Sequence, residues 1–191
     1  MNIIKYILSA LFALVISSYV NAQQLEEVFQ KFKNAKSSSI VFSGQGERYN
    51  LITLGSKYRL ESDNSDILFD GETLYSYNGN TNELVIENIS SSGSLLLNPI
   101  NLFSLDLSDF SYTQKKDGHY TIIPKNIENS QIESIEITLQ NGEIKTLLVT
   151  TPSSYSLDLK INSIKFDENL DSENFKFNKK SYNKAEIIDF R

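Results

Sequence analysis

The chain has 191 residues, a formal net charge of −6 at pH 7, no cysteine and one histidine. Its length suffices for one domain with a substantial hydrophobic core. The lack of cysteine excludes disulfides, thiol catalysis and thiolate metal sites. Nucleic-acid binding requires clustered Lys and Arg, so the acidic balance and the scattered basic residues argue against a nucleic-acid partner.

The first 22 residues have the pattern of a secretory signal peptide. Lys5 supplies the positive charge, an apolar run extends from Ile7 to Val20, and Val20-Asn21-Ala22 is a small-residue cleavage site. We therefore expect cleavage after Ala22 and an exported, soluble mature protein consisting of a single domain over 23–191. No cysteine follows the leader to carry a lipid anchor, so the protein is not expected to be a lipoprotein itself.

The mature chain is predicted to begin with an amphipathic helix and to continue as β-strands. Apolar residues from Leu25 to Ala35 recur at helical spacing, and from Ile40 onward the apolar period changes to two. Short apolar runs then alternate with tight-turn signals. The turn signals are Asp70-Gly71, Asn78-Gly79-Asn80, Asp117-Gly118 and Asn141-Gly142.

The segment from Tyr155 to Phe166 predicts a long strand with one irregularity. Apolar and polar residues alternate up to Ile161, and the phase then slips so that Ile164 and Phe166 continue the apolar face. Such a slip indicates a β-bulge. With about ten strands in sequential hairpins, the chain is predicted to be mainly β (α+β), its antiparallel sheet curling through its twist into an unclosed barrel. Several runs are shorter than the ~9–11 residues of a membrane-spanning strand, which argues against a transmembrane barrel.

A strongly apolar stretch, Leu95–Phe110, interrupts the strands. Asn98 is a suitable N-cap and Pro99 a suitable first helical residue. On a helix, Ile100, Phe103 and Leu107 share one face, whereas Leu105 points nearly opposite. The stretch is therefore either a helix wedged permanently into a core or a movable lid over an apolar cavity. The lid residues would be Leu97, Ile100, Leu102, Phe103, Leu105 and Leu107.

The sequence offers little support for an enzyme. His119 follows a hairpin turn and is most simply a surface residue. A zinc site would have to be built from carboxylates alone, and no G-x-S-x-G elbow is present. The pairs Asp66 and Asp70 or Glu133 and Glu136 could serve a glycosidase, but acids this frequent usually form a solvated face. We therefore expect no catalytic activity, no cofactor and no metal.

The segments Lys57–Glu61 and Asp66–Asn78 resemble the core signature of the LolA family of outer-membrane lipoprotein carriers. In that signature, a basic-aromatic-Arg strand precedes a strand ending in Asp-Gly-Lys-Thr and an apolar-aromatic-x-Tyr strand. This chain has Asp-Gly-Glu-Thr-Leu-Tyr-Ser-Tyr at 70–77. The order of helix, strands, apolar insertion and further hairpins also agrees over 23–191, and Ala185–Asp189 is similar to the family's closing strand.

The resemblance implies a periplasmic carrier, expected to be a monomer, with an N-terminal helix and a helical lid on an unclosed β-barrel. It would receive lipoproteins from an inner-membrane ABC transporter, hold their acyl chains in an apolar cavity and deliver them to the outer membrane, with an outer-membrane acceptor as a further candidate partner. Strand alternation and the first helix select the candidate cavity residues, each of which could equally be ordinary core. These are Phe29, Phe32, Tyr58, Leu60, Leu74, Ile135, Ile137, Leu157 and Leu159.

The chain departs from the family pattern at two places. Family members often carry Arg-Pro or Lys-Pro before the aromatic-Arg strand, and in the best-known type that Arg ties the lid shut. This chain has Leu54-Gly55-Ser56 at the corresponding positions. In addition, Leu60 replaces the aromatic residue that usually follows the Arg of that strand. Three alternatives stay open. They are a carrier of another hydrophobic ligand such as a lipid or pigment precursor, an outer-membrane acceptor, which would lack its lipidated cysteine, and a structural or adhesive β-module.

Overall fold

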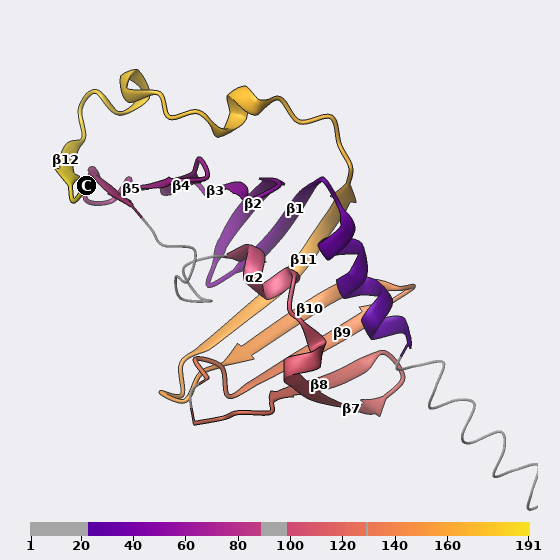
Figure 1. Ribbon diagram of the computed structural model, residues 1–191. Coiled ribbons are helices and arrows are strands. Elements are labelled where there is room, and N and C mark those ends of the chain that lie inside the picture. Colours follow the sequence, from indigo (N-terminus) through magenta and orange to yellow (C-terminus); the bar gives the residue numbers. More distant parts are fainter. Residues whose placement is uncertain (1–22, 89–98, 129) are drawn as a thin grey trace, which may run out of the picture.

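Twelve strands of the described chain form one curled sheet (Figure 1). The computed structural model describes residues 23–88, 99–128 and 130–191, apart from the side chains of Pro99 and Ile100. The first half of the sheet contains β1 Ser37–Gly44, β2 Glu47–Leu54, β3 Lys57–Glu61, β4 Ser65–Phe69, β5 Thr73–Asn78 and β6 Glu83–Asn88. The second half contains β7 Phe110–Lys116, β8 His119–Pro124, β9 Ser134–Gln140, β10 Glu143–Thr150 and β11 Ser156–Phe166, and β12 is Glu186–Asp189.

The sheet consists of two meanders joined at a long-range pairing. Strands β1 to β6 pair in sequence, as do β7 to β11, and β1 pairs with β11 antiparallel. The C-terminal β12 adds to β6 in parallel, so β7 and β12 are the two edges. The mainly β, unclosed sheet confirms the predicted fold class, with twelve described strands where about ten were expected.

Local sequence accounts for the hairpins. At Asn141 and Gly142 the φ angles are +53° and +72°, the left-handed pair that a two-residue hairpin turn of type I′ requires. In the β4–β5 turn, Asp70 Oδ1 accepts hydrogen bonds from the backbone N–H groups of Glu72 and Thr73, at 3.0 and 2.9 Å. These turns set the register of each meander.

The predicted bulge in β11 is confirmed. Val41 pairs with Ser163 and Phe42 with Ile161, which leaves Asn162 as the extra residue of β11. Because one residue is inserted, Ile161 and Ile164 both keep their side chains on the packed face. The bulge bends β11 where the two meanders meet.

Two apolar clusters lie on opposite faces of the sheet. The inner core joins the first helix, residues 23–34, and α2, Pro99–Phe103, to β1, β2, β3, β5 and β8–β11. The outer core lies between β4–β6 and the segment 167–185, here called the strap. Figure 1 shows the two helices on one side of the curled sheet and the strap, in yellow, along the other. No helix among the described residues is long and apolar enough to cross a bilayer.

The apolar insertion is less helical than its sequence predicts. Helix α2 ends at Phe103, and a separate 3-10 turn follows at Leu107–Asp109. Asp106 explains the break, because its side chain accepts a hydrogen bond from the Ser108 N–H and caps the new turn. The break also lets Leu105 turn into the inner core, where it is 7% exposed, instead of pointing away from it.

Candidate functional site

An apolar cavity lies on the inner face of the sheet, beneath α2. Its volume is about 220 Å³, and it is bounded by both meanders as well as by the helix. Strands β1 to β5 supply most of the wall, and β11, the neighbour of β1 in the sheet, supplies Leu157 and Leu159. The cavity is lined by Phe42, Gly44, Gln45, Tyr49, Leu60, Ile67, Leu74, Ser76, Leu102, Phe103, Leu157 and Leu159.

Strand alternation decides which side chains reach the cavity. On β3, Tyr58 and Leu60 face the inner core, as predicted, whereas Arg59 faces outward. On β4 and β5, Ile67 and Leu74 face inward in the same way. Burial in the inner core raises the pKa of the Tyr58 hydroxyl to about 12.

The structure brings four of the nine predicted cavity residues to the cavity. Leu60, Leu74, Leu157 and Leu159 line it. The other five, Phe29, Phe32, Tyr58, Ile135 and Ile137, pack in the inner core without lining it. Residues of the first helix share that core with Ile135 and Ile137, so these side chains are surrounded by core and not by free space.

The lid residues are divided between the cavity and the core. Leu102 and Phe103 belong to both, because they line the cavity and their side chains are buried in the inner core, at 3% and 2% exposure. The Phe103 ring lies 5.4 Å from that of Phe32 and 6.3 Å from that of Phe42, measured between centroids. Leu105 and Leu107 pack in or against the inner core. Leu97 and the side chain of Ile100 lie outside the described residues.

Two aromatic residues that the sequence reasoning missed form the end wall of the cavity. Phe42 and Tyr49 stack with ring centroids 5.2 Å apart and an interplanar angle of 18°. They are paired across β1 and β2. The signal for Phe42 was present, since it alternates with Ile40 on an apolar strand face.

At one end of the cavity, β1, β2 and the start of β11 meet. Gly44 is required there, because a Cβ on it would lie 2.7 Å from the Asp158 carbonyl oxygen and 2.8 Å from Leu159 Cδ2. Beside it, the Gln45 side-chain amide donates to the Tyr155 hydroxyl and joins the two turns across the rim. A close contact between β1 and β11 therefore fixes this end of the cavity.

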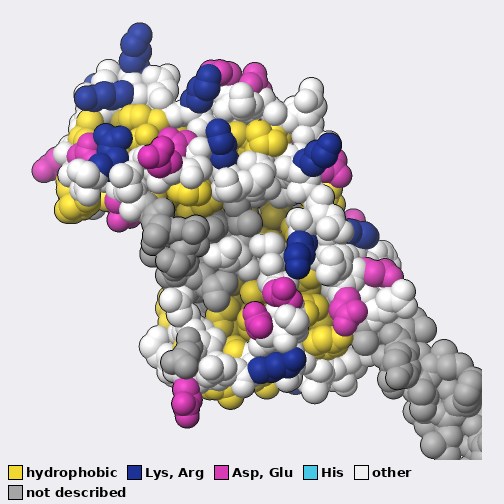
Figure 2. All heavy atoms as spheres, in the orientation of Figure 1, with side chains coloured by type: hydrophobic (Ala, Val, Ile, Leu, Met, Phe, Trp, Pro, Cys, Tyr) yellow, Lys and Arg dark blue, Asp and Glu magenta, His cyan; other side chains and the backbone are white. Residues whose placement is uncertain are grey.

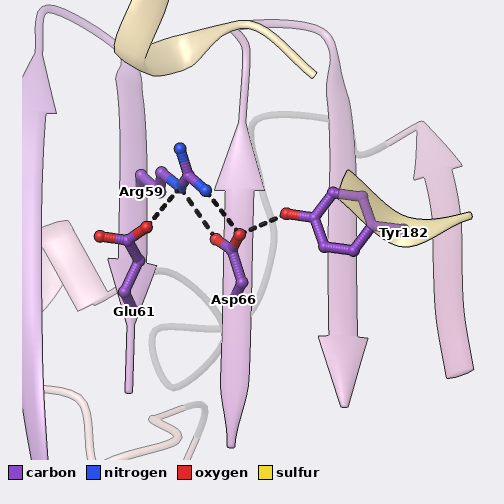
Figure 3. A network of polar contacts seen from close by, with 4 residues as sticks. All are labelled: Arg59, Glu61, Asp66 and Tyr182. Atoms are coloured by element: carbon purple, nitrogen blue, oxygen red, sulfur yellow. Dashed lines mark hydrogen bonds and ion pairs between the residues drawn. The ribbon is translucent and has the colours of Figure 1, made fainter. Parts of the chain in front are cut away.

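Arg59 belongs to an outer-face network rather than to the lid (Figure 3). Its Nε and Nη2 lie 3.0 and 2.7 Å from the two carboxylate oxygens of Asp66, and Nε lies 3.0 Å from Glu61. The bond to Asp66 raises the pKa of Arg59 further above its ordinary value. Tyr182 of the strap donates to the same Asp66 carboxylate. Asp66 therefore binds the strap on the face opposite α2, and Arg59 fixes the position of the Asp66 carboxylate.

Charged groups outside the cavity are dispersed over the surface. On the face shown in Figure 2, Lys and Arg are interspersed with Asp and Glu instead of forming a basic patch. Within the part of the chain that the structure describes, no group of three or more His, Asp or Glu side chains is placed to hold a metal ion. In each carboxylate pair considered for glycoside hydrolysis, one member forms an ion pair with a basic residue. Asp66 binds Arg59, and Glu136 binds Lys115.

His119 is partly exposed at the start of β8, directly after the hairpin turn, and the β8–β9 pairing places it beside Thr138. Its Nδ1 lies 3.2 Å from Thr138 Oγ1. We expect His119→Ala to leave apolar-probe binding unchanged and to cost about 1 kcal/mol or less in the free energy of unfolding, the value of one such hydrogen bond. Probe titration and chemical denaturation test this. Loss of binding in a folded variant would give His119 a functional role.

The fold and the cavity define a class of protein, an unclosed β-barrel with an apolar cavity beneath a short helix. No protein-family model matches the chain, and no curated protein matches it significantly. Solved structures do match. An uncharacterized conserved protein from Thermus thermophilus is similar with a TM-score of 0.54 and 12% identity, covering 88% of this chain and 98% of that one.

Two further solved structures match at lower TM-scores. A putative outer membrane lipoprotein-sorting protein domain from Vibrio parahaemolyticus has a TM-score of 0.37 and 15% identity, covering 82% of this chain and 97% of that one. A LolA superfamily protein from Nitrosomonas europaea has a TM-score of 0.39 and 9% identity, again covering 82% and 97%. The Thermus likeness establishes the fold alone, and the two lower scores carry no argument about function.

Proposed function

We propose that the protein is a periplasmic carrier that holds the acyl chains of lipoproteins in the cavity beneath α2. It receives them from an inner-membrane ABC transporter and releases them to the outer membrane, without catalysing a reaction. One observation carries the proposal: a short helix contributes Leu102 and Phe103 to an apolar cavity that both meanders enclose. The segments Lys57–Glu61 and Asp66–Asn78, which resemble the LolA signature, and the predicted leader support the cargo and the compartment.

The cavity is small for the ligand that we propose. Sites for small organic ligands typically measure about 300–1,000 Å³. The 220 Å³ present here lies below that range. Withdrawal of α2 would add the volume of two large side chains, Leu102 and Phe103, to the cavity. Loading of an acyl chain therefore requires α2 to move.

The energetics explain why such a carrier needs a lid. Burial of an acyl chain yields about 0.8 kcal/mol per CH₂, or roughly 8 kcal/mol for ten carbons. A permanently open apolar groove would associate with other apolar surfaces, and a sealed core could not load. Side chains that fill the empty cavity compete with the ligand, which lowers the net affinity and keeps transfer reversible.

Mass spectrometry of the protein purified without detergent from its native periplasm tests the proposal. Co-purification of acylated polypeptides is the expected result. A bound free lipid or pigment precursor would replace lipoproteins with the other hydrophobic ligand considered above. A protein that carries no apolar ligand, and that fails to bind a neutral apolar fluorophore, would contradict the carrier function and favour a structural β-module.

A further inference from the structure

A second, polar groove continues the apolar cavity along the inner face of the sheet. It measures about 440 Å³ and shares Tyr49, Ile67 and Ser76 with the cavity as lining residues. The groove is formed by the ends of strands β2 to β6 that lie nearest the β1–β2 turn. A ligand whose chain occupies the cavity would therefore place its head in this groove.

The register of the sheet produces a gradient from apolar to polar along β4, β5 and β6. Phe69 pairs with Leu74 nearest the inner core. Two residues further along the inner face, Ile67 pairs with Ser76 and Ser76 with Val85. Two residues further again lies a wholly polar row, in which Asn78 pairs with both Ser65 and Glu83. Side chains two apart share a face, so the three rows form one continuous surface.

The polar end of that surface is negatively charged. The described residues that line the groove include Glu47 and Glu83 and no Lys or Arg. Within the described chain, neither carboxylate takes part in an ion pair. Asn64 Nδ2 lies 3.4 Å from Glu47 Oε1, and hydrogen bonds from the Ser62 and Asn64 side chains lower the pKa of Glu47. The groove therefore carries two carboxylates without an ion-pair partner, beside the apolar cavity.

We propose that this head-group groove selects an amphiphile whose head carries an ammonium group over one of equal chain length whose head carries an anion. The inference rests on the proposed function, because the groove is reached by a ligand whose chain fills the cavity. Glu47, on β2, and Glu83, on β6, stand at the two sides of the groove, so each attracts a cation and repels an anion in it. The neighbouring amides of Asn64 and Asn78 complete a polar surface for the rest of the head. The ammonium could belong to a lipid amine or to a polypeptide.

Displacement of a neutral fluorophore, N-phenyl-1-naphthylamine, by matched amphiphiles tests the inference. Dodecylammonium is compared with dodecanoate, and N-dodecanoyl-lysine amide with N-dodecanoyl-glutamate amide, all below their micellar concentrations. We expect the cationic member of each pair to bind about tenfold more tightly at low ionic strength, since two partly exposed carboxylates each contribute modestly. In about 0.5 M salt the preference should shrink through screening. Preference in the simple pair alone would indicate a lipid amine, and preference in both pairs would include a polypeptide head.

Charge-neutralising variants make the test specific to the groove. The double variant Glu47→Gln/Glu83→Gln should lose most of the preference while keeping its affinity for the neutral fluorophore. The matched control Glu72→Gln/Glu128→Gln removes the same charge from two exposed positions outside the groove and should keep the preference. Equal binding of both members by the wild type, or equal loss in both variants, would overturn the head-group inference and leave the carrier function standing. Failure of every amphiphile and of the fluorophore to bind would overturn both.

Discussion

Replacing Phe103 with aspartate is expected to increase binding of a neutral apolar fluorophore while the sheet stays folded. The wild-type ring is 2% exposed and lies between Phe32 and Phe42, so a carboxylate in its place would be buried without a partner. Burial of an unpaired charge is costly, and the helix can avoid that cost by leaving the cavity. Circular dichroism, thermal unfolding and fluorophore titration measure the outcome, and release of cargo should suffer as well.

The same substitution distinguishes a lid from an ordinary core residue. If Phe103 belongs to a core that opens only on global unfolding, its loss should cost about 3 kcal/mol or more. The melting temperature would then fall sharply, with no gain in fluorophore binding by the folded protein. That result would contradict the lid. A smaller loss of stability, accompanied by tighter fluorophore binding, is the result we expect.

The cysteine-free sequence offers a second, milder test of lid opening. Leu102→Cys places a thiol on α2 at a position that is 3% exposed, and Leu147→Cys places one in β10 at a position that is 0% exposed. We expect a thiol reagent to modify the first much faster than the second under native conditions, because local opening needs less free energy than global unfolding. Equal rates would mean that α2 moves only when the whole domain unfolds.

Local patterns in the sequence account for most of the sheet. The alternation between Tyr155 and Phe166, with its slip after Ile161, was sufficient to place the bulge that the structure has at Asn162. Strand alternation also predicted that the side chains of Tyr58 and Leu60 lie on the inner face of the sheet. These features depend on residues adjacent in sequence, where the side-chain period of a strand leaves little freedom.

The features that could not be predicted depend on competition between distant segments. Ile135 and Ile137 face inward as alternation requires, yet they pack in the inner core together with residues of the first helix, and the cavity forms elsewhere. The helix expected from Pro99 to Leu107 stops at Phe103, since capping by Asp106 outweighs continuation of the helical period. An apolar pattern predicts which face of the sheet a side chain lies on, and it does not predict which other segment packs against that face.

The packing of the strap against the outer face of the sheet could not be predicted from the sequence. Its apolar residues are widely spaced over 167–185, so they show no helical or strand period. In the structure they complete the outer core: Phe175 is 0% exposed, and Phe177 stacks on Tyr75 with centroids 4.1 Å apart. The strap leads into β12, which pairs with β6 in parallel. It therefore supports, from outside, the strands whose inner face lines the cavity.

Asp66→Ala is expected to release the strap and to lower the free energy of unfolding by about 2–3 kcal/mol. The Asp66 side chain is 16% exposed and that of Arg59 27%, so the pair is partly shielded and its rupture should cost less than the ~3–5 kcal/mol of a fully buried pair. Removal of the carboxylate also deprives the Tyr182 hydroxyl of its acceptor. The unpaired guanidinium and hydroxyl then favour exposure to water, which the strap can achieve by detaching.

Hydrogen exchange locates the effect of Asp66→Ala. Amides of 167–185 and of β12 should exchange much faster than in the wild type, whereas those of β9 and β10 should change only as far as global stability does. Asp63→Ala, at an exposed position in the β3–β4 turn, removes the same group without touching the network and should alter neither measurement appreciably. Tyr182→Phe should reproduce the faster exchange in part, since it removes one of the hydrogen bonds and keeps the Arg59–Asp66 pair. Uniform exchange across the whole sheet in Asp66→Ala would show that the network stabilises the domain as a unit, and the strap could then not be regarded as a separable brace for the cavity wall.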